Sequence, residues 1–311
     1  MSKQSERETA IGDHPAIGSE PGWVQLDGAV NVRDLGELPT DDGRTTRPHR
    51  LLRADNLQDL SEADVRLLVD DFGVRQVLDL RTAVEIEFEG PGPITREAAV
   101  TVRELTLYPE AGKRTDALTE DVTGVSSAEA SNPDRTPWTT GRGEPLEIDS
   151  GERPAVIHYL GYLRHASANI IAALRAIGAC RDGATLVHCA AGKDRTGTVI
   201  ALALLLAGVS RDAVVADYAR SGEVIDKIMA RLASTPTYAA DVSDAEGNPV
   251  TDANMDPVTW ASIANRQRPR AETMHRLLEI LDERAGGPIQ WLTDHGLTDD
   301  EQQAIRANLL D

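Results

Sequence analysis

The sequence has only two cysteines, Cys180 and Cys189, and aromatic residues make up 4% of its 311 residues. Two cysteines cannot form the disulfide framework of a small secreted domain, and so low a number fits a reducing compartment. The scarcity of aromatics excludes a core built on large rings. Leu, Val, Ile and Ala must therefore supply most of the buried surface, within an apolar content of 41%.

Long apolar runs are also missing. The longest, residues 199–209, is too short to span a bilayer. Residues 1–22 are polar and charged and lack the apolar stretch of a secretory signal. We therefore expect no stable membrane insertion and a cytoplasmic location, with export by a route without a classical signal left open.

Basic residues are outnumbered by acidic ones: 32 Lys and Arg stand against 51 Asp and Glu, which gives a formal net charge of −19. This balance opposes general binding to nucleic acid or to anionic membranes, so an anionic substrate must be drawn by a local field. The seven histidines are scattered, with no pair at metal-ligand spacing. The sequence therefore implies neither a metal nor another cofactor, and nothing in it indicates an oligomeric state.

The order of predicted elements favours one α/β domain, although the length permits one large domain or two small ones. We expect a disordered tail over 1–22, then a single folded domain over 23–311 with irregular insertions near 108–152 and 235–270. Strands alternating with helices predict a mostly parallel central sheet flanked by helices. The predicted strands are 74–80, 100–107 and 184–188; the predicted helices are 62–72, 159–177, 194–207, 221–232 and two or three within 271–310.

Residues 188–197 read His-Cys-Ala-Ala-Gly-Lys-Asp-Arg-Thr-Gly and separate the predicted strand 184–188 from the helix after it. A tight loop between a strand and a helix gathers backbone N–H groups around one anion, and the helix N-terminus adds partial positive charge. The same field favours a thiolate at Cys189. We expect a nucleophilic sulfur facing a phosphate bound by Ala190, Ala191 and Gly192; the alternative is a buried structural cysteine.

The other polar residues of this loop have assignable roles. Arg195 stays charged and matches two phosphate oxygens at once, so we expect it to clamp the phosphate. Thr196 either donates a hydrogen bond to the sulfur or is a plain first-turn helix residue. Lys193 adds positive field or contacts a second phosphate, unless it is solvated. His188 is expected to hold the loop by hydrogen bonds to the backbone.

A general acid is needed because an alkoxide or phenoxide leaves poorly without a proton. Asp194 is the first candidate, and its alternative role is to tie down a neighbouring arginine. Asp79 is the second candidate, with an ion pair to Arg81 as the alternative. Glu147 and Asp149 lie in the acidic insertion, where nothing in the sequence fixes their position.

Cys-x5-Arg-Thr-Gly after a strand resembles the phosphate loop of the cysteine-dependent protein tyrosine phosphatases, and this form of it is similar to a bacterial branch of that family. Stretches 31–36, 52–55 and 79–85 and the tail 272–310 resemble the same branch. The resemblance implies the family's fold and hydrolysis of phosphotyrosine, and extends to phosphoserine, phosphothreonine and phosphoinositides. It also implies a helical lid over the site, for which 211–270 is the candidate.

Two other functions use similar loops. A rhodanese-type sulfurtransferase also carries a cysteine in an anion-binding loop, and a pseudophosphatase binds phosphate without turnover. The Arg-Thr-Gly ending and the long helix after it favour the phosphatase. A nucleotide-binding loop fits poorly, because Asp194 stands where a magnesium site needs a hydroxyl residue.

Overall fold

The computed structural model describes residues 22–108, 152–239 and 256–311. The expected N-terminal tail, nearly all of the insertion at 108–152 with Glu147 and Asp149, and part of the insertion at 235–270 lie outside these ranges. Within them, no helix is both long enough and apolar enough to cross a membrane.

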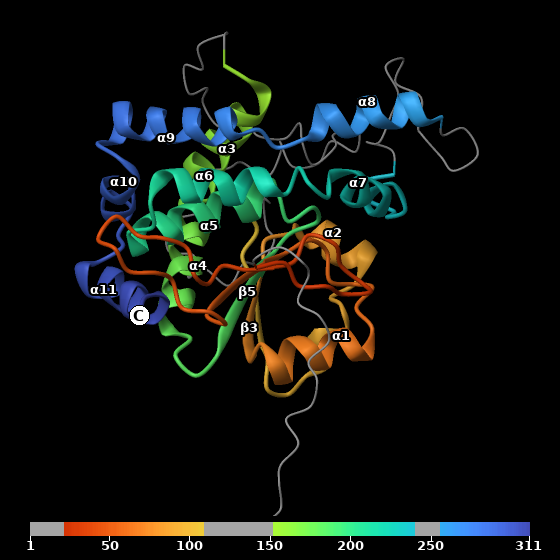
Figure 1. Cartoon of the computed structure of the whole chain (residues 1–311), viewed down its shortest axis with the longest axis horizontal. Coiled ribbons are helices and arrows are strands. Elements are labelled where there is room, and N and C mark those ends of the chain that lie inside the picture. Colours follow the sequence, from red (N-terminus) through yellow and green to blue (C-terminus); the bar gives the residue numbers. More distant parts are fainter. Residues whose placement is uncertain (1–21, 109–151, 240–255) are drawn as a thin grey trace, which may run out of the picture.

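Five strands form one sheet at the centre of the molecule (Figure 1). Their spatial order is β1 (Arg33–Asp34), β2 (Leu51–Ala54), β5 (Ala184–His188), β3 (Val74–Asp79) and β4 (Thr101–Glu104). Only β1 runs antiparallel to its neighbour. The central strand β5 is buried along its whole length, as a parallel strand covered on both faces should be. The predicted fold class is confirmed.

The register of the parallel strands determines where the functional site lies. His188, the last residue of β5, pairs with Ala54 at the end of β2 and with Asp79 at the end of β3. The carboxyl ends of all three strands therefore meet at one edge of the sheet. In parallel α/β sheets this edge is where ligands bind.

Helices cover both faces of the sheet and pack on it through two apolar cores. In Figure 1, α1 lies on one side of the strands and α4, α5 and α11 lie on the other. The helices are α1 (Glu62–Arg66), α2 (Ala83–Glu89), α3 (Pro154–His165), α4 (Ser167–Ala179), α5 (Asp194–Ala207), α6 (Arg211–Arg220), α7 (Ile225–Ala233), α8 (Pro257–Gln267), α9 (Ala271–Ala285), α10 (Pro288–Asp294) and α11 (Asp299–Leu309), with a π-helical segment at Leu67–Asp71 and a 3-10 turn at Pro93–Arg96.

Several predicted elements match the structure closely. The strand 184–188 and the helix 194–207 are found with the same bounds. The predicted helix 62–72 begins after Ser61, whose side chain caps it, and becomes π-helical from Leu67 onward. The predicted strand 100–107 is shorter, Thr101–Glu104. Three helices close the chain, as expected.

Other elements differ from the prediction. The single helix expected over 159–177 is two helices, α3 and α4, which meet at Ala166, where the backbone leaves helical geometry at φ −126°. The break lets α3 pack on α9 while α4 packs on α11. The helix expected over 221–232 starts only at Ile225. The stretch 235–270, expected to be irregular, contains the helix α8, which begins at Pro257 with Asp256 as its cap.

Candidate active site

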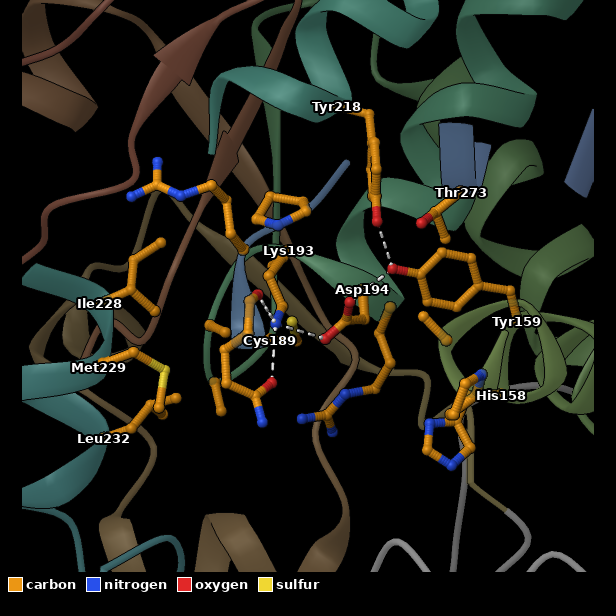
Figure 2. Close-up of a pocket in the computed structure, with 18 of the residues that line it drawn as sticks. His158, Tyr159, Cys189, Lys193, Asp194, Tyr218, Ile228, Met229, Leu232 and Thr273 are labelled. Carbon is orange, nitrogen blue, oxygen red and sulfur yellow. Dashed lines mark hydrogen bonds and ion pairs between the residues drawn. The ribbon is translucent and has the colours of Figure 1, made fainter. Parts of the chain in front are cut away.

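The loop between β5 and α5, residues 189–193, forms the floor of a cavity of about 430 Å³ at the carboxyl edge of the sheet. Cys189 is the first residue of this loop and is 2% exposed. Figure 2 shows its sulfur between Lys193 and Asp194, with Met229 of α7 on one side and Tyr159 of α3 on the other. Of the loop residues predicted from the sequence, those that line this cavity are Cys189, Ala190, Ala191, Lys193, Asp194 and Arg195, whereas Gly192 and Thr196 do not line it.

The carbonyl groups of residues 190–192 are held on the outer side of the loop. The carbonyl of Ala190 accepts a hydrogen bond from the backbone N–H of Asn56 at 3.1 Å. The next two carbonyls accept from the side-chain amide of Asn31 at 3.0 and 3.1 Å, and the second also accepts from Arg53 at 2.6 Å. With these oxygens fixed outward, the loop presents its amides to the cavity, as an anion-binding nest does.

Gly192 is required by its backbone conformation and by its surroundings. Its φ is +62°, a region that L residues with side chains adopt at a cost. A Cβ placed there would lie 2.4 Å from the carbonyl oxygen of Ala54 at the end of β2. The loop therefore lies directly against the neighbouring strand, and only glycine fits at the contact.

A buried ion cluster supports the loop from below. The Asp217 carboxylate of α6 accepts hydrogen bonds from Arg53 at 2.5 Å and from Arg33 at 3.0 Å, and Arg33 donates to the Asn31 side chain at 2.6 Å. Burial acts to raise the pKa of Asp217, but the charges of the two arginines outweigh it and hold this pKa below its ordinary value. The cluster fixes Asn31 and Arg53, the two side chains that hold the loop carbonyls.

Arg195 lies in the first turn of α5 and is 3% exposed. It donates to both carboxylate oxygens of Glu85, at 2.7 and 2.8 Å, and further to the Leu80 carbonyl and the Tyr238 hydroxyl. Burial acts to lower the pKa of Arg195, but the charge of Glu85 and its hydrogen bonds with the guanidinium raise it well above the ordinary value. The guanidinium therefore stays charged beside the sulfur.

Two side-chain polar atoms of residues that flank the loop are buried without a hydrogen-bond partner in the described part of the chain, the Thr196 hydroxyl oxygen and Nδ1 of His188. The other ring nitrogen of His188 lies 3.5 Å from the Asp79 carboxylate. The ring is thus held by a carboxylate, which corrects the expectation that it would hydrogen-bond the backbone. The Thr196 hydroxyl is fully buried and does not line the cavity, so its missing partner must be a neighbouring protein group, for which the sulfur is the candidate from the sequence.

The two candidate acids lie in different surroundings. Asp194 lines the cavity, and its carboxylate accepts from the Tyr159 hydroxyl at 2.5 Å and lies 3.5 Å from Nζ of Lys193. Its partners are thus a phenol and a lysine, not the arginine considered from the sequence. Asp79 lies outside the cavity, where Arg81 donates to both of its oxygens. Burial acts to raise the pKa of Asp79, but His188 and Arg81 lower it well below its ordinary range.

Residues 225–239 and 257–269, which we call the α7–α8 cover, line the side of the cavity opposite α3. Ile228, Met229 and Leu232 of α7 point toward the sulfur in Figure 2. Nζ of Lys193 donates to the Gln267 carbonyl at 2.7 Å and to its side chain at 3.3 Å. Part of the candidate lid region 211–270 therefore does cover the site.

The structure places here several residues for which the sequence predicts no role. Glu85 had the clearest signal, because it stands three residues after Thr82 in a capping box at the start of α2. Tyr159, Asp217 and Tyr238 carried no signal, since each reaches the loop from a distant part of the chain. Among the described residues, no group of three His, Cys, Asp or Glu side chains could hold a metal ion.

Comparison with known proteins assigns the family. A family model described as the tyrosine phosphatase family matches residues 24–311. The triple specificity protein phosphatase PtpB of Mycobacterium tuberculosis is 29% identical over 303 residues, covering 92% of this chain and 98% of that protein. A Cupriavidus necator protein named as a tyrosine-protein phosphatase is 26% identical over 298 residues, covering 88% of this chain and 95% of that protein.

A tyrosine-protein phosphatase of Nostoc commune is 28% identical over 151 residues, covering 49% of this chain and 47% of that protein. The matches to the first two proteins and to the family model span the loop, the sheet and the helices that surround the cavity. They favour a phosphatase over the sulfurtransferase and the pseudophosphatase that the loop alone left open. The chain belongs to the tyrosine phosphatase family and is a phosphatase.

Proposed function

We propose that this protein hydrolyses phosphotyrosine through a phosphocysteine intermediate formed on Cys189. The observation that carries the proposal is the position of the sulfur at the base of a loop whose carbonyls at residues 190–192 are fixed outward. Such a loop binds the three equatorial oxygens of a phosphoryl group and stabilises charge on them in the transition state. Lys193 and Arg195 add positive charge, which offsets the net charge of −19 locally.

In the first step the Cys189 thiolate attacks phosphorus, and the bond from phosphorus to the tyrosine oxygen breaks. The leaving oxygen takes its electron pair and a proton from Asp194. Asp194 lines the cavity and acts in this step as the general acid, donating its carboxyl proton to the leaving oxygen. Arg195 follows the equatorial oxygens as the phosphoryl group moves.

In the second step water attacks the phosphocysteine, the sulfur–phosphorus bond breaks, and Asp194 takes the proton from the water. The sulfur leaves as a thiolate, and the otherwise unpartnered Thr196 hydroxyl donates a hydrogen bond to it. Phosphate is then released and the site is restored. Splitting hydrolysis into two transfers lowers each barrier, as in other covalent mechanisms.

Further substrates belong to the same proposal. The M. tuberculosis relative is named for triple specificity, and we extend the substrate range of this chain to phosphoserine, phosphothreonine and phosphoinositides. Lys193 supports this extension, because its ammonium group lies in the cavity wall where a second phosphate would meet it. A panel of phosphotyrosine peptides, phosphothreonine peptides and inositol phospholipids measures the range directly.

The test of the proposed function is the Cys189→Ser variant with p-nitrophenyl phosphate as substrate. Loss of the nucleophile should lower kcat by about 10⁴-fold or more. Inorganic phosphate should still bind, as tightly as to the unmodified protein or more tightly, because the negative sulfur is gone. Turnover that survives the substitution would exclude Cys189 as the nucleophile.

A further inference from the structure

The Tyr238 side chain lies against Arg195, the cation that the proposed function assigns to phosphate binding. Tyr238 follows α7 in the cover and is 2% exposed. Its hydroxyl accepts from Nη2 of Arg195 at 2.9 Å and donates a short hydrogen bond to Glu85. The hydroxyl therefore bridges the two members of the ion pair and directs a lone pair at the guanidinium.

The hydrogen bonds of Arg195 show which of its N–H groups the Tyr238 hydroxyl occupies. Glu85 takes one N–H from each terminal nitrogen, and the Leu80 carbonyl takes the second N–H of Nη1. The second N–H of Nη2 goes to Tyr238, and the four hydrogen bonds of Arg195 within the described residues all come from Nη1 and Nη2 and leave Nε unused. Nε–H and that second Nη2–H lie on the same edge of the guanidinium, which is the edge left for a two-pronged grip on phosphate.

The cover also caps the second cation of the loop. Lys193 donates to the backbone carbonyl of Gln267 at the end of α8. On the other side, Arg231 of α7 lies 3.1 Å from the Asp55 carboxylate and donates to the Asn56 carbonyl, next to the end of β2. The closed cover thus supplies neutral oxygens to both cations where a phosphate would supply charged ones.

We propose that Tyr238 is an internal competitor for the phosphate site: its hydroxyl holds the edge of Arg195 that substrate needs, so substrate binding must displace it. The inference rests on the proposed function of Arg195. Without the Tyr238 hydroxyl, Arg195 lacks one acceptor and Glu85 lacks one donor when the cover is closed. Bound phosphate supplies a new acceptor to Arg195. Removing the hydroxyl therefore destabilises the closed arrangement more than the phosphate complex.

The test is the Tyr238→Phe variant of the full chain, with inorganic phosphate as the probe. We expect phosphate to bind about tenfold more tightly than to the unmodified protein, which corresponds to one hydrogen bond to a charged group. Calorimetry measures this binding without turnover, and hydrogen exchange over 225–238 should be faster in the variant before any phosphate is added. Thr235→Val is the matched control, because among the described residues the Thr235 hydroxyl bonds only to the Leu232 carbonyl.

Each outcome decides a different point. Weaker phosphate binding in Tyr238→Phe would make Tyr238 a positioning residue for Arg195 and overturn the inference, and unchanged binding would also overturn it. If Thr235→Val tightens phosphate binding as much as Tyr238→Phe does, the effect comes from general loosening of the segment, and the inference is wrong. If the unmodified protein binds no phosphate at all, the proposed function itself fails.

Discussion

At the residue scale, the proposed function makes Asp194 the general acid, and its carboxylate lines the cavity. The Tyr159 hydroxyl that donates to it stays protonated, because burial and the charge of Asp194 raise the pKa of Tyr159 well above its ordinary value. This contact fixes the direction of the carboxylate beside the sulfur. Asp79 has no such access, since its oxygens are taken by Arg81.

We predict that Asp194→Asn slows phenyl phosphate hydrolysis by about 10²-fold or more, as loss of a general acid does. Hydrolysis of p-nitrophenyl phosphate should slow less, because p-nitrophenolate leaves without a proton. The ratio of kcat/KM for the two substrates is the measurement, and Asp79→Asn is the control that should leave this ratio unchanged. Equal slowing of both substrates by Asp194→Asn would remove Asp194 from the role.

At the element scale, the position of the loop at residues 189–193 depends on its contact with β2. Two glycines with positive φ flank α5, Gly192 at its start and Gly208 at its end. A Cβ at Gly192 would collide with the backbone of Ala54, whereas a Cβ at Gly208 meets nothing within 4 Å. Replacing each glycine by alanine therefore separates two effects: both substitutions strain the backbone, but only the one at Gly192 displaces the loop.

Gly192→Ala should lower kcat/KM by about 100-fold, because a shift of the loop by roughly 1 Å misplaces the amides that bind phosphate. Gly208→Ala should lower the free energy of unfolding by about 1 kcal/mol through strain and leave kcat/KM within about twofold. Steady-state kinetics and urea unfolding of both variants make the comparison. Full activity in Gly192→Ala would show that the loop does not depend on this contact.

The sequence predicted some elements and missed others for physical reasons. The strand and helix around Cys189 were placed correctly, because a fully buried apolar run followed by a glycine loop and a second apolar run leaves few alternatives. The break at Ala166 was missed because apolar spacing continues through it and no proline or glycine marks it. β1 and β2 are two and four residues long, too short for any periodicity to show.

At the scale of the whole molecule, the site is held by residues that lie far apart in the sequence. Glu85, Asp217 and Tyr238 contact the loop or its supports across 43 to 184 positions. Spacing within a motif cannot show such pairs, so the sequence predicted the loop but not what holds it. Resemblance to the family had already marked the segment that contains Glu85, although without a role for its side chain.

The ion cluster of Asp217 predicts a dependence of stability on pH. The pKa of Asp217 is lower in the folded chain than the ordinary value of about 3.9 expected on unfolding. Its contribution is therefore present above about pH 4 and is lost as the pH falls through and below that value. Asp217→Asn should lower the free energy of unfolding at pH 7 by about 3 kcal/mol or more, because two buried guanidiniums lose their counter-charge.

Below pH 4 the variant and the unmodified protein should converge, since the unmodified carboxylate is then losing its own stabilising charge. Urea unfolding followed from pH 7 to pH 3 measures both curves. Asp42→Asn is the control, because Asp42 pairs with Arg44 on the surface, where water screens the ion pair and its contribution to stability is small. Parallel curves for Asp217→Asn and the unmodified protein across this range would contradict the assignment.

The central claim is that a phosphoryl group passes through the sulfur of Cys189. Acid quenching during turnover of a phosphotyrosine peptide, followed by peptide mapping with mass spectrometry, tests it directly. We predict that the peptide containing Cys189 gains the mass of one phosphoryl group and that Cys189→Ser shows no such gain under the same conditions. A phosphoryl group found on another residue, or turnover with no phosphorylated enzyme at any quench time, would contradict the account.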